Sequence, residues 1–286
     1  MRKTVTFFNL GTLLISLLGL NLDTHGSFDQ LIGNKLLAET KYIEYNAQAS
    51  TGEEKYAKKL DELKITLHPG TDYTPESKSS PSSLKHCKSL VYRTLKSLPI
   101  DQTRKLKHLT LYFTKEGRRG LGGSSTIILR CQNVTDQELV SVLVHEMGHV
   151  TDTGTIVGTE SSGQSGYMDG GIPIYNDDPS IEFYSLDFRN DKALKEDVSS
   201  MDFVSGYAMS DPFEDFAESY AYYVLHGDEF RQIAVSNDVL QKKYDYLKDE
   251  VFKGKEYFNG NGKADPAVRN YDVTVLPYEM NKFFVI

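Results

Sequence analysis

Val144-His145-Glu146-Met147-Gly148-His149 lies within a run, residues 136 to about 151, that predicts a helix. Thr135 followed three residues later by Glu138 is a typical helix-starting pair. Positions i and i+4 of a helix lie on one face, one turn apart. We therefore expect His145 and His149 to project side by side, where they can share one metal ion.

The residue types of this stretch indicate zinc chemistry. Two neutral imidazoles at this spacing are common zinc ligands, and a glutamate that directly follows the first histidine can take a proton from water activated by the metal. Glu146 occupies that position. The same short pattern also arises by chance, so a third ligand is the feature that would separate a metal site from a coincidence.

A candidate third ligand lies in a second predicted helix. Asp211 with a proline directly after it predicts a helix start, and Gly227 predicts the stop after His226. Glu214 and Glu218 are four residues apart in this helix, so one face carries two carboxylates. The alternative is an acidic face exposed to solvent. Apolar residues near the two glutamates favour a packed helix: Phe213, Phe216, Ala217 and Ala221.

Two blocks of the sequence, HEMGHVTD at 145–152 and GYAMSDPFEDFAES at 206–219, carry a family resemblance. They resemble the catalytic core of the lethal-factor-like metallopeptidases, which include the catalytic domain of anthrax lethal factor and the secreted Pro-Pro endopeptidases. That family is of the gluzincin type, in which a glutamate is the third zinc ligand. The specific match covers these two blocks, and elsewhere only the order of the elements agrees.

The resemblance implies a role for each matched residue. It implies one Zn²⁺ per chain held by three ligands, with a glutamate as general base and a tyrosine, seven residues before the third ligand, that stabilises the oxyanion. A carboxylate four residues after that ligand would orient a zinc histidine, and an acidic residue three positions after the second histidine also matches the family. In this sequence the ligands are His145, His149 and Glu214, the base and tyrosine are Glu146 and Tyr207, and the two further carboxylates are Glu218 and Asp152.

The expected fold class is α+β: a zincin-like metallopeptidase domain with a small twisted sheet, the HExxH helix and a mostly helical C-terminal part. Apolar spacing of three and four residues predicts a helix over 82–98, alternation predicts a strand over 108–113, and β-branched residues predict a strand over 125–131. A glycine-rich turn is predicted at 117–123. Further helices are expected at 229–234 and 238–252, and a short strand at 271–276.

The strand at 125–131 leads directly into the HExxH helix. In zincins the strand before that helix is commonly a sheet edge, along which an extended substrate can pair through its backbone. By this analogy we expect 125–131 to be the edge. The alternative is an ordinary interior strand.

The N-terminus, residues 1–26, resembles a secretory signal peptide. Arg2 and Lys3 precede an apolar stretch, and small residues precede Ser27. We expect a secreted protein with a mature end near Ser27; an uncleaved membrane anchor is the alternative. Residues 27–80 are mixed and polar, with a weak helix candidate at 54–67, and are interpreted as an N-terminal extension, propeptide or linker. The metallopeptidase domain is assigned to 81–286.

The chain has two cysteines, Cys87 and Cys131. Export makes a disulfide between them possible, whereas Cys87 also lies on an apolar helix face that suits a buried thiol. Both alternatives stand on the sequence alone. Two cysteines remote from the histidines do not suggest a cysteine zinc site.

Charge and loop composition limit the partners. The net charge of −8 and the pI of 5.4 argue against a nucleic-acid partner. Residues 153–204 form a long polar insertion of a kind that often serves as a lid or binding loop. Its Asp169, Asp177 and Asp178 do not have the spacing of a calcium loop, so solvated turns are expected there.

These observations together predict a secreted zinc endopeptidase that acts on an extended peptide or protein as a monomer, with no stable membrane partner after signal cleavage. The alternative from another class is a secreted binding or toxin module that keeps the zincin fold without turnover. The presence of Glu146 argues against that alternative, because a site without turnover has no use for a base.

Overall fold

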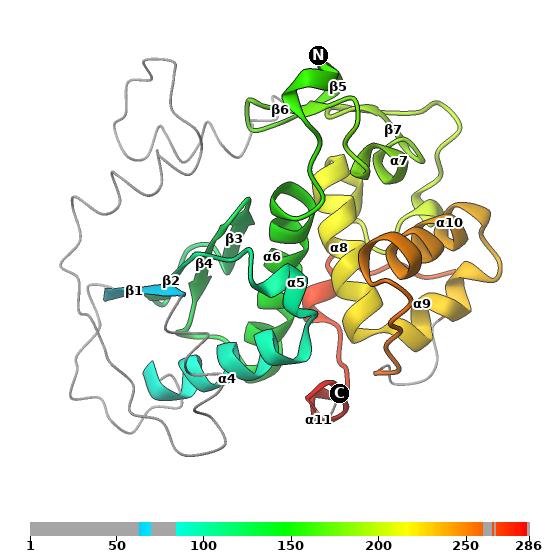
Figure 1. Cartoon of the computed structure of the whole chain (residues 1–286). Coiled ribbons are helices and arrows are strands. Elements are labelled where there is room, and N and C mark those ends of the chain that lie inside the picture. The colour runs from blue at the N-terminus through cyan, green and yellow to red at the C-terminus, as the bar shows by residue number, and fades with distance from the viewer. Residues whose placement is uncertain (1–62, 70–83, 260–264, 266, 285–286) are drawn as a thin grey trace, which may run out of the picture.

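The structure of the protein, a computed structural model, describes residues 63–69, 84–259, 265 and 267–284. The predicted signal peptide at 1–26 lies outside the described residues, as does most of the predicted extension at 27–80. The described chain has the expected α+β composition, with a small sheet on one side and helices packed on the other (Figure 1).

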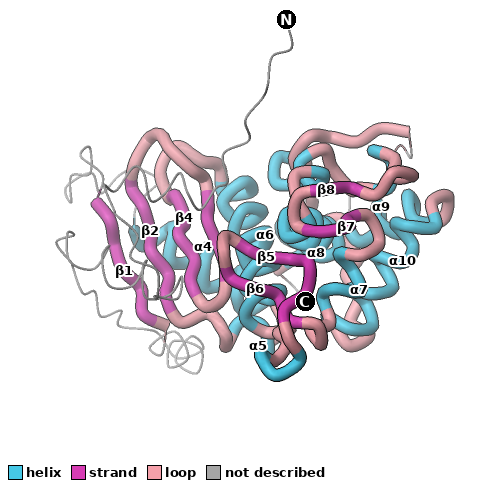
Figure 2. The backbone as a smooth tube through the Cα atoms, turned by 90° about the horizontal axis from the view of Figure 1, so that it is seen from above, coloured by secondary structure: helices cyan, strands magenta, loops and turns pink. Residues whose placement is uncertain are grey.

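The sheet has four strands in the order β1-β2-β4-β3. Strands β1, β2 and β4 lie side by side (Figure 2) and run parallel, whereas β3 pairs antiparallel with β4. Alternating burial in β2 directs its leucines into the core, as the sequence predicts. The strand bounds are β1 Lys64–Pro69, β2 His108–Phe113, β3 Gly120–Gly123 and β4 Thr126–Arg130.

Three expectations about this sheet are wrong. Strand β4 is interior rather than an edge, because β2 and β3 occupy its two sides, and the edge strand next to it is the glycine-rich β3. The predicted turn at 117–123 therefore supplies a strand in its second half. The last residues of the weak helix candidate at 54–67 belong to β1, so the predicted extension contributes a strand to the sheet.

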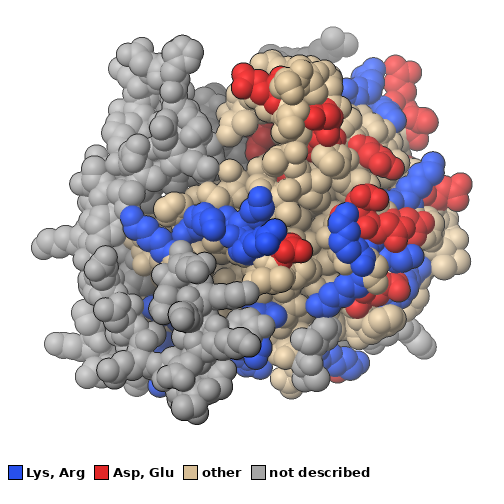
Figure 3. Space-filling view, viewed as in Figure 1, with Lys and Arg blue, Asp and Glu red and all other residues tan. Residues whose placement is uncertain are grey.

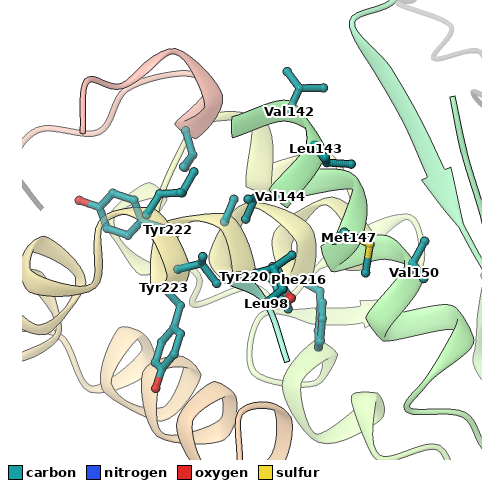
Figure 4. Packing of buried hydrophobic residues seen from close by; sticks show 14 of the residues in the cluster. Leu98, Val142, Leu143, Val144, Met147, Val150, Phe216, Tyr220, Tyr222 and Tyr223 are labelled. Carbon is teal, nitrogen blue, oxygen red and sulfur yellow. The ribbon is translucent and has the colours of Figure 1, made fainter. Parts of the chain in front are cut away.

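Helix α6, Asp136–Gly154, lies between the sheet and the helical half. It packs against β3 and β4 on one side and against α8, Pro212–Leu225, on the other. Figure 4 shows buried apolar side chains that the two helices contribute to the core, including Met147 of α6 and Phe216 and Tyr220 of α8. The helices approach closely at Gly148, where a Cβ would lie 2.8 Å from the Ala217 Cα. Glycine at this position therefore allows the contact.

Helix α4, Leu84–Ser97, packs against α6. Of the two alternatives for the cysteines, the structure has the disulfide: Cys87 of α4 is bonded to Cys131, directly after β4. The bond joins α4 to the segment that leads into the HExxH helix. Both cysteines are buried.

The insertion between α6 and α8 folds into two small hairpins and a short helix. The first hairpin lies over the adjoining ends of α6 and α8 (Figures 1 and 2). Of the three aspartates expected in solvated turns, Asp177 is exposed and accepts from Thr159. The expectation is wrong for Asp178, which is buried and accepts from the Gly158 amide, and for Asp169, which is the last residue of β5. The elements are η1 Glu160–Ser162, β5 Gln164–Asp169, β6 Ile172–Tyr175, α7 Ser180–Tyr184, β7 Phe188–Asn190, β8 Ala193–Leu194 and η2 Ser200–Asp202.

The C-terminal part is helical, with two corrections. Gly227 was expected to follow the end of α8, but α8 already ends at Leu225, and Gly227 is the first residue of the next helix, α9. The strand expected at 271–276 is a 3₁₀ turn, since the Asp272 carboxylate accepts from the Thr274 amide and caps it. The remaining elements are α5 Ile100–Thr103, η3 Tyr207–Met209, α9 Gly227–Ala234, α10 Asp238–Tyr246, a π turn Leu247–Val251, η5 Val273–Val275 and α11 Met280–Phe283.

The surface carries charges of both signs. Figure 3 shows a short row of basic side chains toward the sheet half and mixed charges over the helical half. The described part of this face therefore carries both positive and negative charge. Within the described ranges, none of the helices has the length and apolarity needed to cross a bilayer.

Candidate metal centre

Helix α6 presents both histidines of the motif on one face. Its first turn is fixed by Thr135, whose hydroxyl accepts a hydrogen bond from the Glu138 amide at 3.1 Å. The ring centroids of His145 and His149 are 5.0 Å apart. The sequence predicts both the helix and this shared face, since residues four apart meet on an α-helix.

Helix α8 brings Glu214 to the histidines. Asp211 caps this helix by accepting from the Phe213 and Glu214 amides at 3.0 and 2.9 Å. Glu214 Oε2 lies 3.2 Å from His145 Nε2 and 3.4 Å from His149 Nε2. One ligand atom from each of these three residues lies within 4.8 Å of the others. They are the group of possible metal ligands found in the described part of the chain.

The spacing of these atoms fits a zinc ion. Ligand atoms about 2.0–2.2 Å from a tetrahedral ion lie about 3.3–3.6 Å apart, close to the two measured carboxylate–imidazole separations. Two imidazole nitrogens and one carboxylate oxygen also form a donor set of catalytic zinc, which keeps a fourth position open. The residues present therefore fit the ion that the motif implies.

The electrostatics of the three residues favour positive charge between them. Burial lowers the pKa of His149, but the Glu214 carboxylate outweighs burial and raises that pKa to about 9. Burial also opposes the charged form of His145, whose hydrogen bonds to Glu214 and Glu218 hold its pKa well above the ordinary value. A divalent cation satisfies the same preference when it displaces the protons.

Glu218 supports His145 from behind. Its Oε1 lies 2.9 Å from His145 Nδ1, and its Oε2 accepts from the Ser205 hydroxyl at 2.6 Å and the Val273 amide at 2.8 Å. A proton held on Nδ1 leaves the Nε2 lone pair directed toward Glu214. The structure thus places Glu218 where the sequence predicts an orienting carboxylate.

Tyr207 lies beside the third ligand. Its hydroxyl donates to Glu214 Oε1 at 2.9 Å, and its ring stacks on His145 with a centroid distance of 6.2 Å. Burial raises the pKa of Tyr207, and the Glu214 charge adds to that shift, so the phenol stays protonated and remains a donor. The residue expected to stabilise an oxyanion is therefore brought to the centre as a hydrogen-bond donor.

Glu146 lies against the glycine-rich edge strand. A Cβ on Gly120 would lie 2.2 Å from Glu146 Oε1, and one on Gly122 would lie 2.6 Å from the Glu146 backbone oxygen. Only glycines allow β3 and α6 to approach this closely. Burial raises the pKa of Glu146, which brings the carboxylate closer to the range of a general base; a backbone hydrogen bond from Gly122 partly opposes the shift.

Asp152 lies apart from the histidines' hydrogen bonds. Both of its oxygens accept from the Tyr184 hydroxyl at 2.7 Å, and burial raises its pKa to about 8. In the described part of the chain, no hydrogen bond joins its side chain to the His149 ring. The structure therefore gives Asp152 a place in the packing of α7 on α6.

A cavity of about 400 Å³ opens beside the centre. It is lined by the three possible ligands, by Glu146, Tyr207 and β3, and by residues 271, 272 and 274 of the C-terminal segment. The sequence gives no sign that this segment reaches the site. Arg119, just before β3, and Ser205, which contacts Glu218, were likewise not predicted, because isolated residues of these types are common on any surface.

Comparison of the chain with protein-family models, curated proteins and solved structures gives no match.

Proposed function

We propose that this chain is a zinc-dependent endopeptidase of the gluzincin type, with a zincin-like, lethal-factor-like catalytic domain. The observation that carries the proposal is the convergence of three ligand atoms at zinc-ligand spacing: His145 Nε2, His149 Nε2 and Glu214 Oε2. Glu146 is buried on α6, the helix that carries the two histidines. His145, His149 and Glu214 would hold one ion. The intact base favours turnover over a binding module that kept only the fold.

The residues divide the reaction between them. Zinc, when bound, supplies a Lewis acid and lowers the pKa of a coordinated water to about 7. Glu146 takes the proton of the attacking water and delivers it to the departing amine. The Tyr207 hydroxyl donates to the oxygen on which negative charge develops. Glu218 keeps the His145 ring in the ligating tautomer.

The position of β3 at the edge of the sheet indicates which class of substrate the proposed enzyme would bind. One side of β3 pairs with β4, and the other borders the cavity. An extended peptide can add to such an edge through backbone hydrogen bonds, which places its carbonyl groups next to Glu146. The substrate is therefore proposed to be an unfolded or loop segment of a protein, bound in extended form.

The Cys87–Cys131 disulfide supports the predicted export of the chain. Disulfides persist in oxidising compartments and are rare in the cytosol. We propose a secreted protein that acts as a monomer, with a mature end near Ser27. Mass spectrometry of the exported protein would check that end.

Metal content and cleavage of a peptide library test the proposal together. The purified protein should hold about one Zn²⁺ per chain. Glu146→Ala should keep the metal and lose cleavage, whereas Glu214→Ala should also lose the metal. Glu116→Ala, on the exposed loop before β3, serves as the matched control. A protein that takes up no transition metal on reconstitution would end the zinc proposal, and zinc without cleavage of any library peptide would favour the binding module.

A further inference from the structure

Residues 270–274, which we call the strap, contribute Tyr271, Asp272 and Thr274 to the lining of the cavity, and η5 at their end packs against α6 and α8. The Asn270 and Tyr271 carbonyls accept hydrogen bonds from the Gly206 and Tyr207 amides at 2.9 and 2.6 Å. The strap therefore holds the backbone of the proposed oxyanion donor. Its Tyr271 ring lies beside the Tyr207 ring, with centroids 6.0 Å apart.

The strap also reaches the support of the first histidine. Val273 is fully buried, and its amide donates to Glu218 Oε2 at 2.8 Å. The other oxygen of Glu218 contacts His145 Nδ1. A carboxylate held by a backbone amide and by the Ser205 hydroxyl has little freedom to turn, so the amide fixes the plane in which Glu218 meets the ring.

One arginine ties the strap to the edge strand. Arg119, which precedes β3, donates to the Asp272 carboxylate and, at 2.7 Å, to Thr274 Oγ1. The Asp272 carboxylate also accepts from the Thr274 amide at 2.7 Å. A guanidinium that bridges two neighbours in this way fixes their relative position better than a point charge does.

We infer that the strap is part of the metal centre: the Val273 amide is a positioning group for Glu218, and the Arg119–Asp272 pair holds that amide in place. The line of contacts runs from Arg119 to Asp272, through Val273 to Glu218, and from there to His145. This inference rests on the proposed zinc site. The inference extends the site beyond α6 and α8, because Asp272 and Val273 belong to the strap and Arg119 lies just before β3.

Proline and alanine at position 273 separate the amide from the side chain. Val273 is the first residue of η5, where proline fits, and Asp272 has the extended backbone that precedes proline readily. Val273→Pro removes the N–H donor and keeps three side-chain carbons, whereas Val273→Ala keeps the donor and loses two methyl groups, so the alanine variant carries the larger loss of apolar packing. Zinc release to a colorimetric chelator should be about 10–100-fold faster in the proline variant than in the alanine variant.

The visible spectrum of the cobalt-substituted protein gives a second readout that packing alone would not change. It should shift in Val273→Pro and stay near wild type in Val273→Ala, because the His145 ring changes its orientation only in the first. Equal release rates and equal spectra in the two variants would overturn the inference. Wild-type protein that binds neither zinc nor cobalt would instead reject the zinc site itself, so the two failures are distinguishable.

The Arg119–Asp272 pair is tested by a double-mutant cycle on zinc release. Arg119→Gln and Asp272→Asn should each speed release several-fold. The effect of the double variant should be smaller than the two single effects combined, because the Arg119–Asp272 contact is lost in both, although Arg119 also contacts Thr274 and Glu138. The exposed Arg104–Asp101 pair on α5 provides the control cycle, with no change expected. Additive effects, or release at the wild-type rate, would contradict the role of the pair; this cycle also decides the inference if Val273→Pro does not fold.

Discussion

Glu214 and Asp215 are neighbours in α8 but belong to two different buried clusters. Glu214 faces His145 and His149 in what we call the open cluster, which borders the cavity. Asp215 faces the other way, where the Lys243 ammonium lies 2.7 Å from its Oδ2 and 2.5 Å from Asp187 Oδ2. These three residues, all nearly without exposure, form the closed cluster.

The difference between the clusters is the source of the positive charge. In the closed cluster the chain provides its own cation, which the Asp202 carbonyl at 3.0 Å and the Phe203 ring at 4.2 Å further enclose. The open cluster offers lone pairs and a carboxylate but no lysine or arginine between them, and it connects to a cavity. Lys243 supplies the counter-charge to the carboxylates of the closed cluster, whereas in the open cluster the proposed zinc ion would supply it.

Lys243→Met should produce the largest effect on folding. It leaves Asp187 and Asp215 buried without their cation, and breaking a buried ion pair in this way costs about 3–5 kcal/mol. Urea denaturation of the metal-free protein would measure the loss in the free energy of unfolding. Lys242→Met, at the exposed neighbouring position, is the control and should change it by less than about 0.5 kcal/mol. Equal losses in the free energy of unfolding for the two variants would contradict a structural role of the closed cluster.

Glu214→Gln and Asp215→Asn should differ in their response to zinc. Free zinc at about 1,000 times its dissociation constant should stabilise the wild-type protein by about 4 kcal/mol. That gain should disappear in Glu214→Gln, which loses a charged ligand, and persist in Asp215→Asn, which faces away. Thermal unfolding with and without zinc measures the gain. A zinc response in both variants would show that the open cluster is not where zinc binds.

Tyr207→Phe should affect turnover and leave both clusters intact. Removal of one oxyanion donor lowers kcat by about 10²–10³, and kcat/KM should fall with it because the hydrogen bond strengthens in the transition state. Zinc content and thermal stability should stay near wild type. Tyr112→Phe, in β2 and outside the cavity, is the control. An unchanged kcat on a cleavable peptide would return Tyr207 to a packing role.

The smallest effect expected is a pH dependence of the closed cluster. Burial raises the pKa of Asp215 from 3.8 to about 7. Between about pH 4 and 7 the folded state therefore keeps a proton that the unfolded state has lost, and the free energy of unfolding falls as pH rises. Asp215→Asn removes this proton, so its stability relative to wild type should improve from pH 5 to 7, by at most about 1.4 kcal/mol per pH unit.

Urea denaturation of metal-free protein at pH 5, 6 and 7 would measure this pH dependence. Asp101→Asn, at an exposed position, should run parallel to wild type and serves as the control. A stability difference between Asp215→Asn and wild type that stays constant with pH would contradict the shifted carboxyl.

Local rules were sufficient for the two helices of the centre. The capping residues Thr135 and Asp211 each act as predicted, and the four-residue spacing brings His145 and His149 to one face. The same rules did not distinguish Glu214 from Asp215. Which neighbour faces the histidines depends on the rotation of α8 about its axis, and that rotation is set by packing against α6.

The edge strand and the strap were not predictable for a different reason. Glycines have low strand propensity, so 120–123 suggested a turn. The strand forms by pairing with β4, and the close approach to Glu146 leaves no room for a Cβ at positions 120 and 122. The contacts of the strap join residues far apart along the chain, and neither Val273 nor Asp272 carries a local signal for them. Lys243 also gave no sign of burial, since lysines are mostly exposed.

The position of the strap in the sequence determines when the centre can be completed during synthesis. The ligands and Glu218 leave the ribosome well before Val273, whose amide holds Glu218. At about 5–20 residues per second, the interval between positions 218 and 273 is roughly 3–11 s. A chain caught in that interval has its metal ligands without their support. In the proposed peptidase, full activity would thus require synthesis to pass the strap, well after the last ligand has been made.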